Sequence, residues 1–451
     1  MKRGSLSPEE RARLLGRVAA RAEAPVRSEP PPVPAAPLDD LSDLEMFGQM
    51  QVMRSAGRLL GIDDPFLRPH DGRAGATTVL GGREFLNFSS YDYLGLNGHP
   101  AVQAAAKAAI DRYGVSTSAS RIVAGERPIH RELERRLADL HGAEDAVAFV
   151  SGHATNTTVI GHVLGRDDLI LHDALIHNSV VQGAMLSGAR RLAFPHNDAE
   201  ACARLLDEHR GKAGRALIVV EGVYSMDGDS PDLPAFVALA RRTRSWIMVD
   251  EAHSLGVLGA AGRGIGERDG VAGADVDFWM GTLSKTLAGC GGYIAASAQM
   301  VEYLKLTAPG FVYSVGLPPP IAGAAVAALD VMAAEPGRVA RLNANALRLR
   351  DGARAAGLDT GSSEGVAIVP VITGSSIKAA QLSQRLLERG INVQPILHPA
   401  VAERSARLRF FLSAEHTPAQ IDHAVSVMAE EWARPELGAF DMAELTARLG
   451  G

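Results

Sequence analysis

Two charged residues follow short apolar stretches that have the composition of buried strands. Asp250 comes directly after residues 246–249, and Lys285 follows residues 278–280 within a turn of small, hydroxylated residues. Taken alone, the aspartate could cap a helix, and the lysine could be a solvated surface charge. The glycines that follow the lysine, however, let the backbone approach a ligand closely. An amine and a carboxylate in one crevice can support nucleophilic and acid–base chemistry.

The pattern along the chain predicts that both residues stand at one edge of a sheet. From about residue 100, amphipathic stretches alternate with short apolar runs at residues 146–150, 169–171, 216–220, 246–249 and 278–280. This alternation predicts an α/β fold whose sheet is largely parallel. In such sheets, ligands bind beyond the carboxyl ends of the strands, where Asp250 and Lys285 stand.

Composition and periodicity divide the chain into five parts. A short helix over residues 5–22 precedes a proline-rich stretch typical of a stiff linker. After about residue 336 the strand and helix units become shorter, which predicts a separate α+β lobe. We expect, in order, an N-terminal helix and linker (1–45), an N-terminal segment (46–100), a large domain (101–335), a small C-terminal α+β domain (336–436) and a tail (437–451).

Eight short motifs in collinear order carry a resemblance to a known family. Two of them, Asp250-Glu-Ala-His253 and Gly281-Thr-Leu-Ser-Lys285, contain the residues introduced above. The other six are Asn87-Phe-Ser-Ser-Tyr-Asp-Tyr93-Leu-Gly-Leu96, Ser120-Arg121 with Gly125, Ser151-Gly152-His153-Ala-Thr-Asn156, His172-Asp173 through His177-Asn-Ser179, Glu221-Gly-Val-Tyr-Ser225-Met-Asp-Gly228-Asp229 and Ser314-Val-Gly-Leu-Pro318-Pro319. Together they resemble the α-oxoamine synthases, which are pyridoxal 5'-phosphate (PLP) enzymes of fold type I. Serine-palmitoyltransferase-like and polyketide-associated members are the most similar.

The resemblance assigns roles around the cofactor ring. It implies that Lys285 binds PLP as a Schiff base and later acts as the base at the substrate Cα. Asp250 would keep the pyridine nitrogen protonated, because a buried carboxylate beside that N–H raises its pKa. By the same resemblance, His177 stacks on the ring, while His253 and Ser225 hydrogen-bond on the side of the ring oxygen.

The phosphate of PLP requires donors without bulk. Ser151, Gly152 and His153 follow a predicted strand and begin a helix, whose free N–H groups and dipole favour an anion. Thr282 and Ser284 would add hydroxyl donors. The resemblance also implies a homodimer with shared active sites, in which a Ser-Thr pair from the partner completes the phosphate site. This chain has Ser314 followed by Val315, so only the serine could make that contact.

The substrates follow from the same resemblance. Arg409 would bind the amino-acid carboxylate with its guanidinium fork, while Arg407 has a structural role and Asn87 is a further substrate-binding residue. The implied reaction is the decarboxylative condensation of serine, alanine or glycine with an acyl thioester, carried by coenzyme A or an acyl carrier protein, to give an α-amino ketone. Members that use a carboxylated acyl chain carry an arginine where this chain has Leu397, so an uncharged acyl chain is expected.

Composition limits the partners and the compartment. The chain is 46% hydrophobic and 22% charged and has a net charge of −6, which disfavours nucleic acid as a partner. No apolar run approaches the roughly 20 residues of a membrane span. The two cysteines, Cys202 and Cys290, cannot form a disulfide framework or a zinc knuckle, and we expect a cytoplasmic enzyme of lipid or polyketide biosynthesis without a metal.

Other functions remain open from the sequence. Within the family, the alternatives are 8-amino-7-oxononanoate synthase and 2-amino-3-ketobutyrate-CoA ligase. A fold type I aminotransferase or aldolase is less consistent with the Gly-Thr-Leu-Ser-Lys turn and with the Arg407-Leu-Arg409 motif. A non-catalytic DNA-binding regulator would need a winged-helix module, and residues 1–45 are too short and too rich in proline for one.

Overall fold

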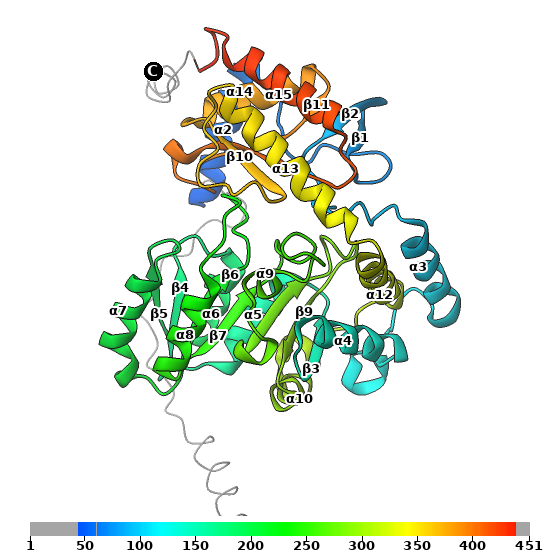
Figure 1. Ribbon diagram of the computed structural model, residues 1–451, viewed down its shortest axis with the longest axis vertical. Coiled ribbons are helices and arrows are strands. Elements are labelled where there is room, and N and C mark those ends of the chain that lie inside the picture. The colour runs from blue at the N-terminus through cyan, green and yellow to red at the C-terminus, as the bar shows by residue number, and fades with distance from the viewer. Residues whose placement is uncertain (1–43, 60, 439–451) are drawn as a thin grey trace, which may run out of the picture. The chain divides into compact units, whose positions relative to one another are not determined.

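The computed structural model describes residues 44–59 and 61–438 (Figure 1). The chain divides into two compact units after Gly57. The described residues of the first unit are Leu44 and most of helix α2 (Glu45–Leu59), and the second unit contains all the other helices and strands described. The helix predicted over residues 5–22, and the proline-rich stretch after it, lie outside the described residues.

The second unit contains a seven-stranded sheet in the order β3-β9-β8-β7-β6-β4-β5. Six of the strands run parallel, and β9 is antiparallel to both of its neighbours. The predicted, largely parallel sheet is therefore confirmed. Its strands are β3 (Asp145–Phe149), β4 (Leu169–Asp173), β5 (Arg190–Phe194), β6 (Ala216–Glu221), β7 (Trp246–Asp250), β8 (Phe278–Thr282) and β9 (Gly292–Ala296).

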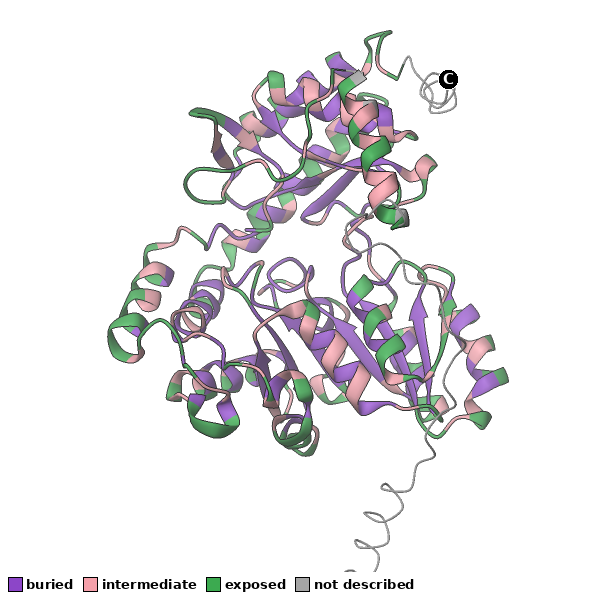
Figure 2. Ribbon diagram, turned by 180° about the vertical axis from the view of Figure 1, so that it is seen from behind, coloured by how far each residue is buried: buried purple, intermediate pink, exposed green. Residues whose placement is uncertain are grey.

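Helices flank this sheet because its strands are apolar on both faces. Most of the strand residues are buried (Figure 2), and they form one core with side chains such as Val159 and Ile160 of α5 and Val180 of α6. In α4, Leu133 and Leu137 lie on the buried face of an otherwise charged helix. The helices of this domain are α3 (Pro100–Tyr113), α4 (Pro128–His141), α5 (Gly152–Val163), α6 (Asn178–Ser187), α7 (Ala199–His209), α8 (Leu233–Thr243), α9 (Ile265–Asp269), α10 (Ala298–Thr307), α11 (Pro309–Val312) and α12 (Pro319–Ala334).

A smaller α+β part follows, as predicted. An antiparallel sheet has the order β10-β13-β12, with strands β10 (Ile368–Ile372), β12 (Gln394–Ile396) and β13 (Arg407–Phe411). Its helices are α13 (Gly337–Ala355), α14 (Ser376–Glu388) and α15 (Pro418–Trp432). An early hairpin of β1 (Thr77–Leu80) and β2 (Arg83–Asn87) joins this part, because β2 pairs in parallel with β11 (Ile391–Asn392).

No helix among the described residues is long and apolar enough to span a bilayer. Within the same residues, no group of three or more His, Cys, Asp or Glu side chains could hold a metal ion.

Candidate active site

Two acidic residues end adjacent strands of the large sheet. Asp250 closes β7 and Glu221 closes β6, and the two are direct partners in the strand register. Asp250 is only 4% exposed, and its carboxylate accepts hydrogen bonds from the Ala252 N–H at 3.0 Å and from Asn156 Nδ2 at 2.8 Å. Burial and the charge of Asp250 hold the pKa of Glu221 well above its usual range.

Lys285 lies in the turn after β8 at the same sheet edge. Burial lowers its pKa to about 8, although Asp250 and Glu221 oppose that shift. Its Nζ is 5.9 Å from the ring centroid of Tyr91. A substantial fraction of this amine is therefore neutral near pH 8, and a neutral amine is what a nucleophilic or basic lysine needs.

A chain of hydrogen bonds joins Asp250 to His177. Asn156 Nδ2 also donates to Ser179 Oγ at 2.9 Å, and that hydroxyl lies 2.7 Å from His177 Nδ1. The backbone N–H of His177 donates to Glu221 Oε1 at 2.6 Å, so its position at the start of α6 is fixed from two sides. Burial lowers the pKa of His177. Asn156 and Ser179 belong to motifs seen in the sequence, but the sequence assigned them no role.

His253 is buried and held by Tyr93. The Tyr93 hydroxyl lies 2.6 Å from His253 Nδ1, and burial holds the pKa of the histidine well below its usual range. Phe411 stacks on the imidazole at 6.4 Å between ring centroids, and Tyr91 packs edge-on at 6.0 Å. If Tyr93 donates to Nδ1, the neutral ring carries its proton on Nε2, which is then a donor.

The first turn of α5 forms a narrow cradle beside the turn after β8. Ser151 caps the helix, and the N–H groups of its first turn have no acceptor within the helix. A Cβ added at Gly152 would lie 2.9 Å from Thr282 Oγ1, which is itself 2.6 Å from Ser284 Oγ. Small residues, free N–H groups and clustered hydroxyls fit a phosphate group. Together with Asp250 and Lys285, this donor set fits PLP.

Arg409 presents an unused hydrogen-bond donor. Its Nη1 donates to the Ser225 carbonyl at 3.1 Å, whereas its buried Nε has no partner among the described residues. By contrast, Arg407 is committed to Asp227, at 2.6 Å, and to the Met226 carbonyl. An arginine with a free buried N–H can receive a carboxylate, so Arg409 is the better placed of the two.

Both polar atoms of the Asn87 side chain are already hydrogen-bonded within the protein. Its Nδ2 donates to the Gly75 carbonyl, and its Oδ1 accepts from Ser89 N–H and Asn392 Nδ2. These bonds tie β2 to β11. Tyr91, four residues later in the same motif, faces Lys285 and Phe411 instead, and the sequence did not single it out.

Two other predicted residues lie outside this cluster or at its rim. His153 is exposed on the first turn of α5, 6.3 Å between ring centroids from His177. Ser314 lies in the loop between α11 and α12 and lines the same small cavity as Arg121.

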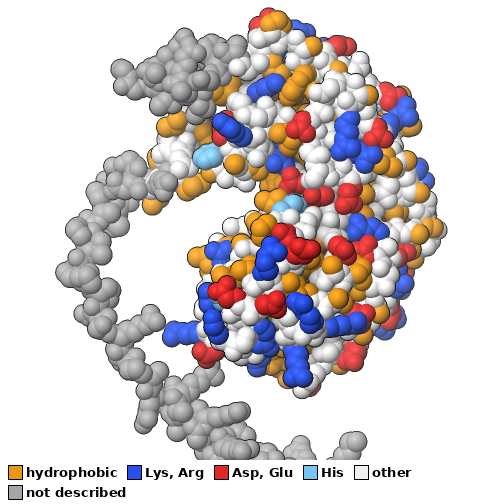
Figure 3. Space-filling model, turned by 60° about the vertical axis from the view of Figure 1, so that its left-hand side comes forward, with side chains coloured by type: hydrophobic (Ala, Val, Ile, Leu, Met, Phe, Trp, Pro, Cys, Tyr) orange, Lys and Arg blue, Asp and Glu red, His pale blue; other side chains and the backbone are white. Residues whose placement is uncertain are grey.

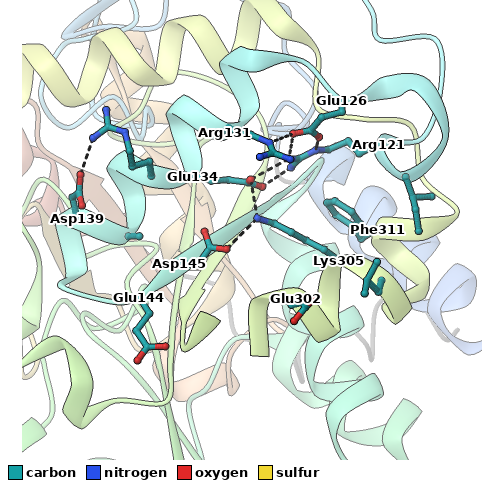
Figure 4. Close-up of a pocket in the computed structure, with 14 residues that line it drawn as sticks. Arg121, Glu126, Arg131, Glu134, Asp139, Glu144, Asp145, Glu302, Lys305 and Phe311 are labelled. Carbon is teal, nitrogen blue, oxygen red and sulfur yellow. Dashed lines mark hydrogen bonds and ion pairs between the residues drawn. The ribbon is translucent and has the colours of Figure 1, made fainter. Parts of the chain in front are cut away.

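A pocket of about 550 Å³ near Arg121 contains none of the predicted site residues (Figure 4). Two of its cations pair with acidic side chains of the same pocket: Arg121 binds Glu126 and Glu134, and Lys305 binds Glu134 at 3.0 Å and Asp145 at 3.5 Å. Lys/Arg and Asp/Glu side chains are also interspersed over the face in Figure 3, so that face has no extended region of one sign.

Comparison with known proteins agrees with this arrangement. Residues 83–428 match the family described as aminotransferase class I and II. The chain is 45% identical to an 8-amino-7-oxononanoate synthase of Geobacter sulfurreducens, covering 85% of this chain and 96% of the relative. The corresponding protein of Geotalea daltonii is 42% identical, covering 86% and 97%.

Solved structures show the same architecture. Serine palmitoyltransferase of Sphingomonas wittichii has a TM-score of 0.82 and 32% identity, covering 87% of this chain and 98% of that one. A lysine-to-alanine variant of a serine palmitoyltransferase of S. paucimobilis, with a bound PLP–myriocin aldimine, has a TM-score of 0.81 and 31% identity, covering 87% of this chain and 98% of that one. These matches show that the chain belongs to the aminotransferase class I and II family and, within it, to the PLP-dependent C-acyltransferases known as α-oxoamine synthases.

Proposed function

We propose that this enzyme condenses a small amino acid, serine or alanine in preference to glycine, with an uncharged acyl thioester to give an α-amino ketone and carbon dioxide. Binding of the amino-acid substrate is supported by the buried Nε of Arg409, which has no hydrogen-bond partner among the described residues and can donate to a carboxylate. Arg409 stacks on Phe411 at 4.6 Å, and Phe411 packs against Tyr91, which faces Lys285. A carboxylate bound to Arg409 would therefore bring its Cα towards the lysine.

Each residue then has a defined task. PLP, when bound, supplies the electron sink that lets a proton leave the amino-acid Cα. Lys285 Nζ receives that proton. The Asp250 carboxylate would hold a proton on the ring nitrogen, and the hydrogen bond from Asn156 Nδ2 keeps that carboxylate in place.

The remaining residues position the cofactor and protect it. His177 would stack on the ring, and His253 and Ser225 would hydrogen-bond on the side of the ring oxygen. The α5 cradle, formed by Ser151, Gly152 and His153, would hold the phosphate together with Thr282 and Ser284.

The acyl chain is assigned from Leu397. This side chain is 9% exposed and follows β12 at the position where members that use a carboxylated chain carry an arginine. Burying a charged chain end without a partner is costly. Each buried CH₂ of a neutral chain, by contrast, contributes about 0.8 kcal/mol.

A second candidate is 8-amino-7-oxononanoate synthase. It is supported by the names of the relatives at 45% and 42% identity, which match nearly their full length. The two candidates differ in whether the acyl chain ends in a methyl group or in a carboxylate.

Heptanoyl and pimeloyl thioesters of coenzyme A separate the candidates, because their chains are equally long and only one ends in a charge. Carbon dioxide release should require an acyl thioester, and kcat/KM should be at least about tenfold higher with heptanoyl-CoA, as expected when a buried charge lacks a partner. Leu397→Arg should improve the use of pimeloyl-CoA. Equal or better use of pimeloyl-CoA by the wild type would establish the second candidate instead.

The assembly and its setting are part of the proposal. We propose a homodimer in which Ser314 reaches the partner's phosphate site, since Tyr313 and Val315 beside it are 86% and 49% exposed. An acyl carrier protein could dock on the basic N-terminal segment, which contains Arg11, Arg13, Arg17 and Arg21. The cytoplasm is the proposed location, where the free Cys202 and Cys290 stay reduced.

A further inference from the structure

His196 bridges two buried carboxylates away from the cofactor residues. Its Nδ1 lies 2.9 Å from Asp173 Oδ1, and its Nε2 lies 3.1 Å from Asp229 Oδ2. Both aspartates are buried, and the edge of the Tyr224 ring packs against the imidazole at 4.5 Å. Although burial alone would lower the pKa of His196, the two carboxylates raise it to about 10. The imidazole is thus a cation at neutral pH, bonded at both nitrogens.

One end of this bridge sets the turn that leads to His177. Asp173 is the last residue of β4, and its carboxylate accepts hydrogen bonds from the N–H groups of Leu175, at 2.8 Å, and Asn197, at 2.7 Å. Four residues after Asp173, His177 caps α6. The hydrogen bonds of Asp173 therefore help to position the turn between β4 and His177.

The other end of the bridge holds the loop of residues 222–230, which follows β6. Asp229 Oδ2 also accepts from Ser362 Oγ at 2.7 Å, and the Gly228 carbonyl accepts from Glu364 N–H at 3.0 Å. Ser362 and Glu364 precede β10 in the smaller α+β part. The loop of residues 222–230 is therefore hydrogen-bonded to the smaller α+β part through Ser362 and Glu364.

The same loop contacts the arginine of the site. Arg409 Nη1 donates to the Ser225 carbonyl, and Arg407 is bonded to Asp227 and Met226. Any shift of the loop moves the surface against which Arg409 is oriented. Asp229 Oδ1 has no hydrogen-bond partner among the described residues, so its carboxylate depends on His196 and Ser362.

We propose that His196 is a positioning residue for amino-acid binding: its charged bridge between Asp173 and Asp229 fixes the loop of residues 222–230, and through it the orientation of Arg409, relative to His177. The inference rests on the amino-acid role proposed above for Arg409.

The test is serine binding to the PLP-loaded full-length enzyme, measured by the change in visible absorbance and so without turnover. His196→Gln keeps a polar side chain but removes the charge. The dissociation constant of serine should rise about tenfold, the loss expected when charged hydrogen bonds are broken. Ser362→Ala breaks only the hydrogen bond from Ser362 Oγ to Asp229 and should raise the dissociation constant of serine about threefold. The KM for the acyl thioester should change less than about twofold in both variants.

Two reference variants make the outcome decisive. His162→Gln removes a histidine on α5 that bonds Thr307 at 2.8 Å, and serine binding should not change.

Equal weakening of serine, acyl thioester and PLP binding in His196→Gln would indicate a general structural role and overturn the proposal. If Arg409→Gln weakens serine binding while His196→Gln and Ser362→Ala do not, the role of His196 is refuted. If Arg409→Gln has no effect, the role proposed for Arg409 is refuted instead. Should His196→Gln fail to fold, Ser362→Ala decides alone.

Discussion

The lowered pKa of Lys285 predicts how the rate of PLP loading depends on pH. Burial lowers the pKa to about 8, and the nearby carboxylates of Asp250 and Glu221 limit the shift. Only the neutral amine can bond to the aldehyde carbon of PLP. The rate at which PLP loads into the apoenzyme should therefore rise about tenfold per pH unit below pH 8 and level off above it. Stopped-flow absorbance across the pH range measures this rate.

Two variants control that measurement. Lys285→Ala should show no covalent loading at any pH, and borohydride reduction of the wild type followed by peptide mapping should place the pyridoxyl group on Lys285. In Asp250→Asn, a charge that raises the lysine pKa is removed, so the midpoint should move to lower pH. A pyridoxyl group on any other lysine would contradict the assignment.

Asp250 itself should be essential for turnover. Asp250→Asn removes the charge that keeps the ring nitrogen protonated, and each tenfold loss of rate corresponds to about 1.4 kcal/mol of barrier. We expect kcat to fall by about three orders of magnitude, because a buried ion pair is lost. Asp277→Asn is the matched control. Asp277 precedes β8, at the end of the strand opposite to Lys285, and its carboxylate accepts a hydrogen bond from the Ile247 N–H. Activity of Asp250→Asn within tenfold of wild type would show that another group does this work.

At the scale of single elements, the start of α5 determines cofactor affinity. A Cβ at Gly152 would enter the space between the helix and Thr282, where the phosphate is proposed to bind. Gly152→Ala should raise the dissociation constant of PLP about tenfold, since charge-assisted hydrogen bonds are displaced. Fluorescence titration of the apoenzyme measures this constant.

Gly161→Ala serves as the comparison on the same helix. Its Cβ would meet Leu186, a side chain that is 66% exposed and can move aside. PLP affinity should stay at the wild-type value in this variant. Equal weakening in both variants would mean that α5 is sensitive to substitution along its length and that the cradle has no special role.

The elements also show what local sequence can and cannot predict. Strands β6, β7 and β8 were predictable because each is a short apolar run that ends in a polar residue, and parallel order places those ends together. Strand β9 was not predicted, and its antiparallel direction depends on pairing with β3 and β8 rather than on its own residues.

Side-chain partners were harder to predict than strands. The roles of Asn156 and Tyr93 follow from contacts made 94 and 160 residues away in sequence, to Asp250 and His253. The substrate-binding role of Asn87 stays a prediction, and its bonds to Gly75 and Asn392 are visible only once β2 and β11 are paired.

At the scale of the whole molecule, exposed apolar side chains gather near Ser314. Ile122 and Leu306 line the pocket beside Phe311, and Val315 lies next to the same phenylalanine. All three are more than two-fifths exposed in the single chain. Such a patch is typical of a subunit interface.

Shared active sites can be tested by mixing two inactive variants. A heterodimer of Lys285→Ala with Ser314→Asp has one site with an intact lysine and an intact partner serine. Random mixing should restore about a quarter of wild-type activity, because half the dimers are mixed and each has one intact site. Adding Ile122→Asp to both chains should abolish the restored activity. A verified heterodimer without activity would indicate a site contained within one chain.

The pairing of β2 with β11 imposes an order on biosynthesis. Asn87 and Asn392, bonded across these strands, are 305 residues apart in sequence. At typical translation rates, the hairpin emerges from the ribosome roughly 15 to 60 seconds before its third strand exists. The large sheet, which ends at Ala296, is complete well within that interval. The nascent chain therefore carries an unpaired β2 edge after the strands of the large sheet have been synthesised, and the smaller part can close only once β11 has been made.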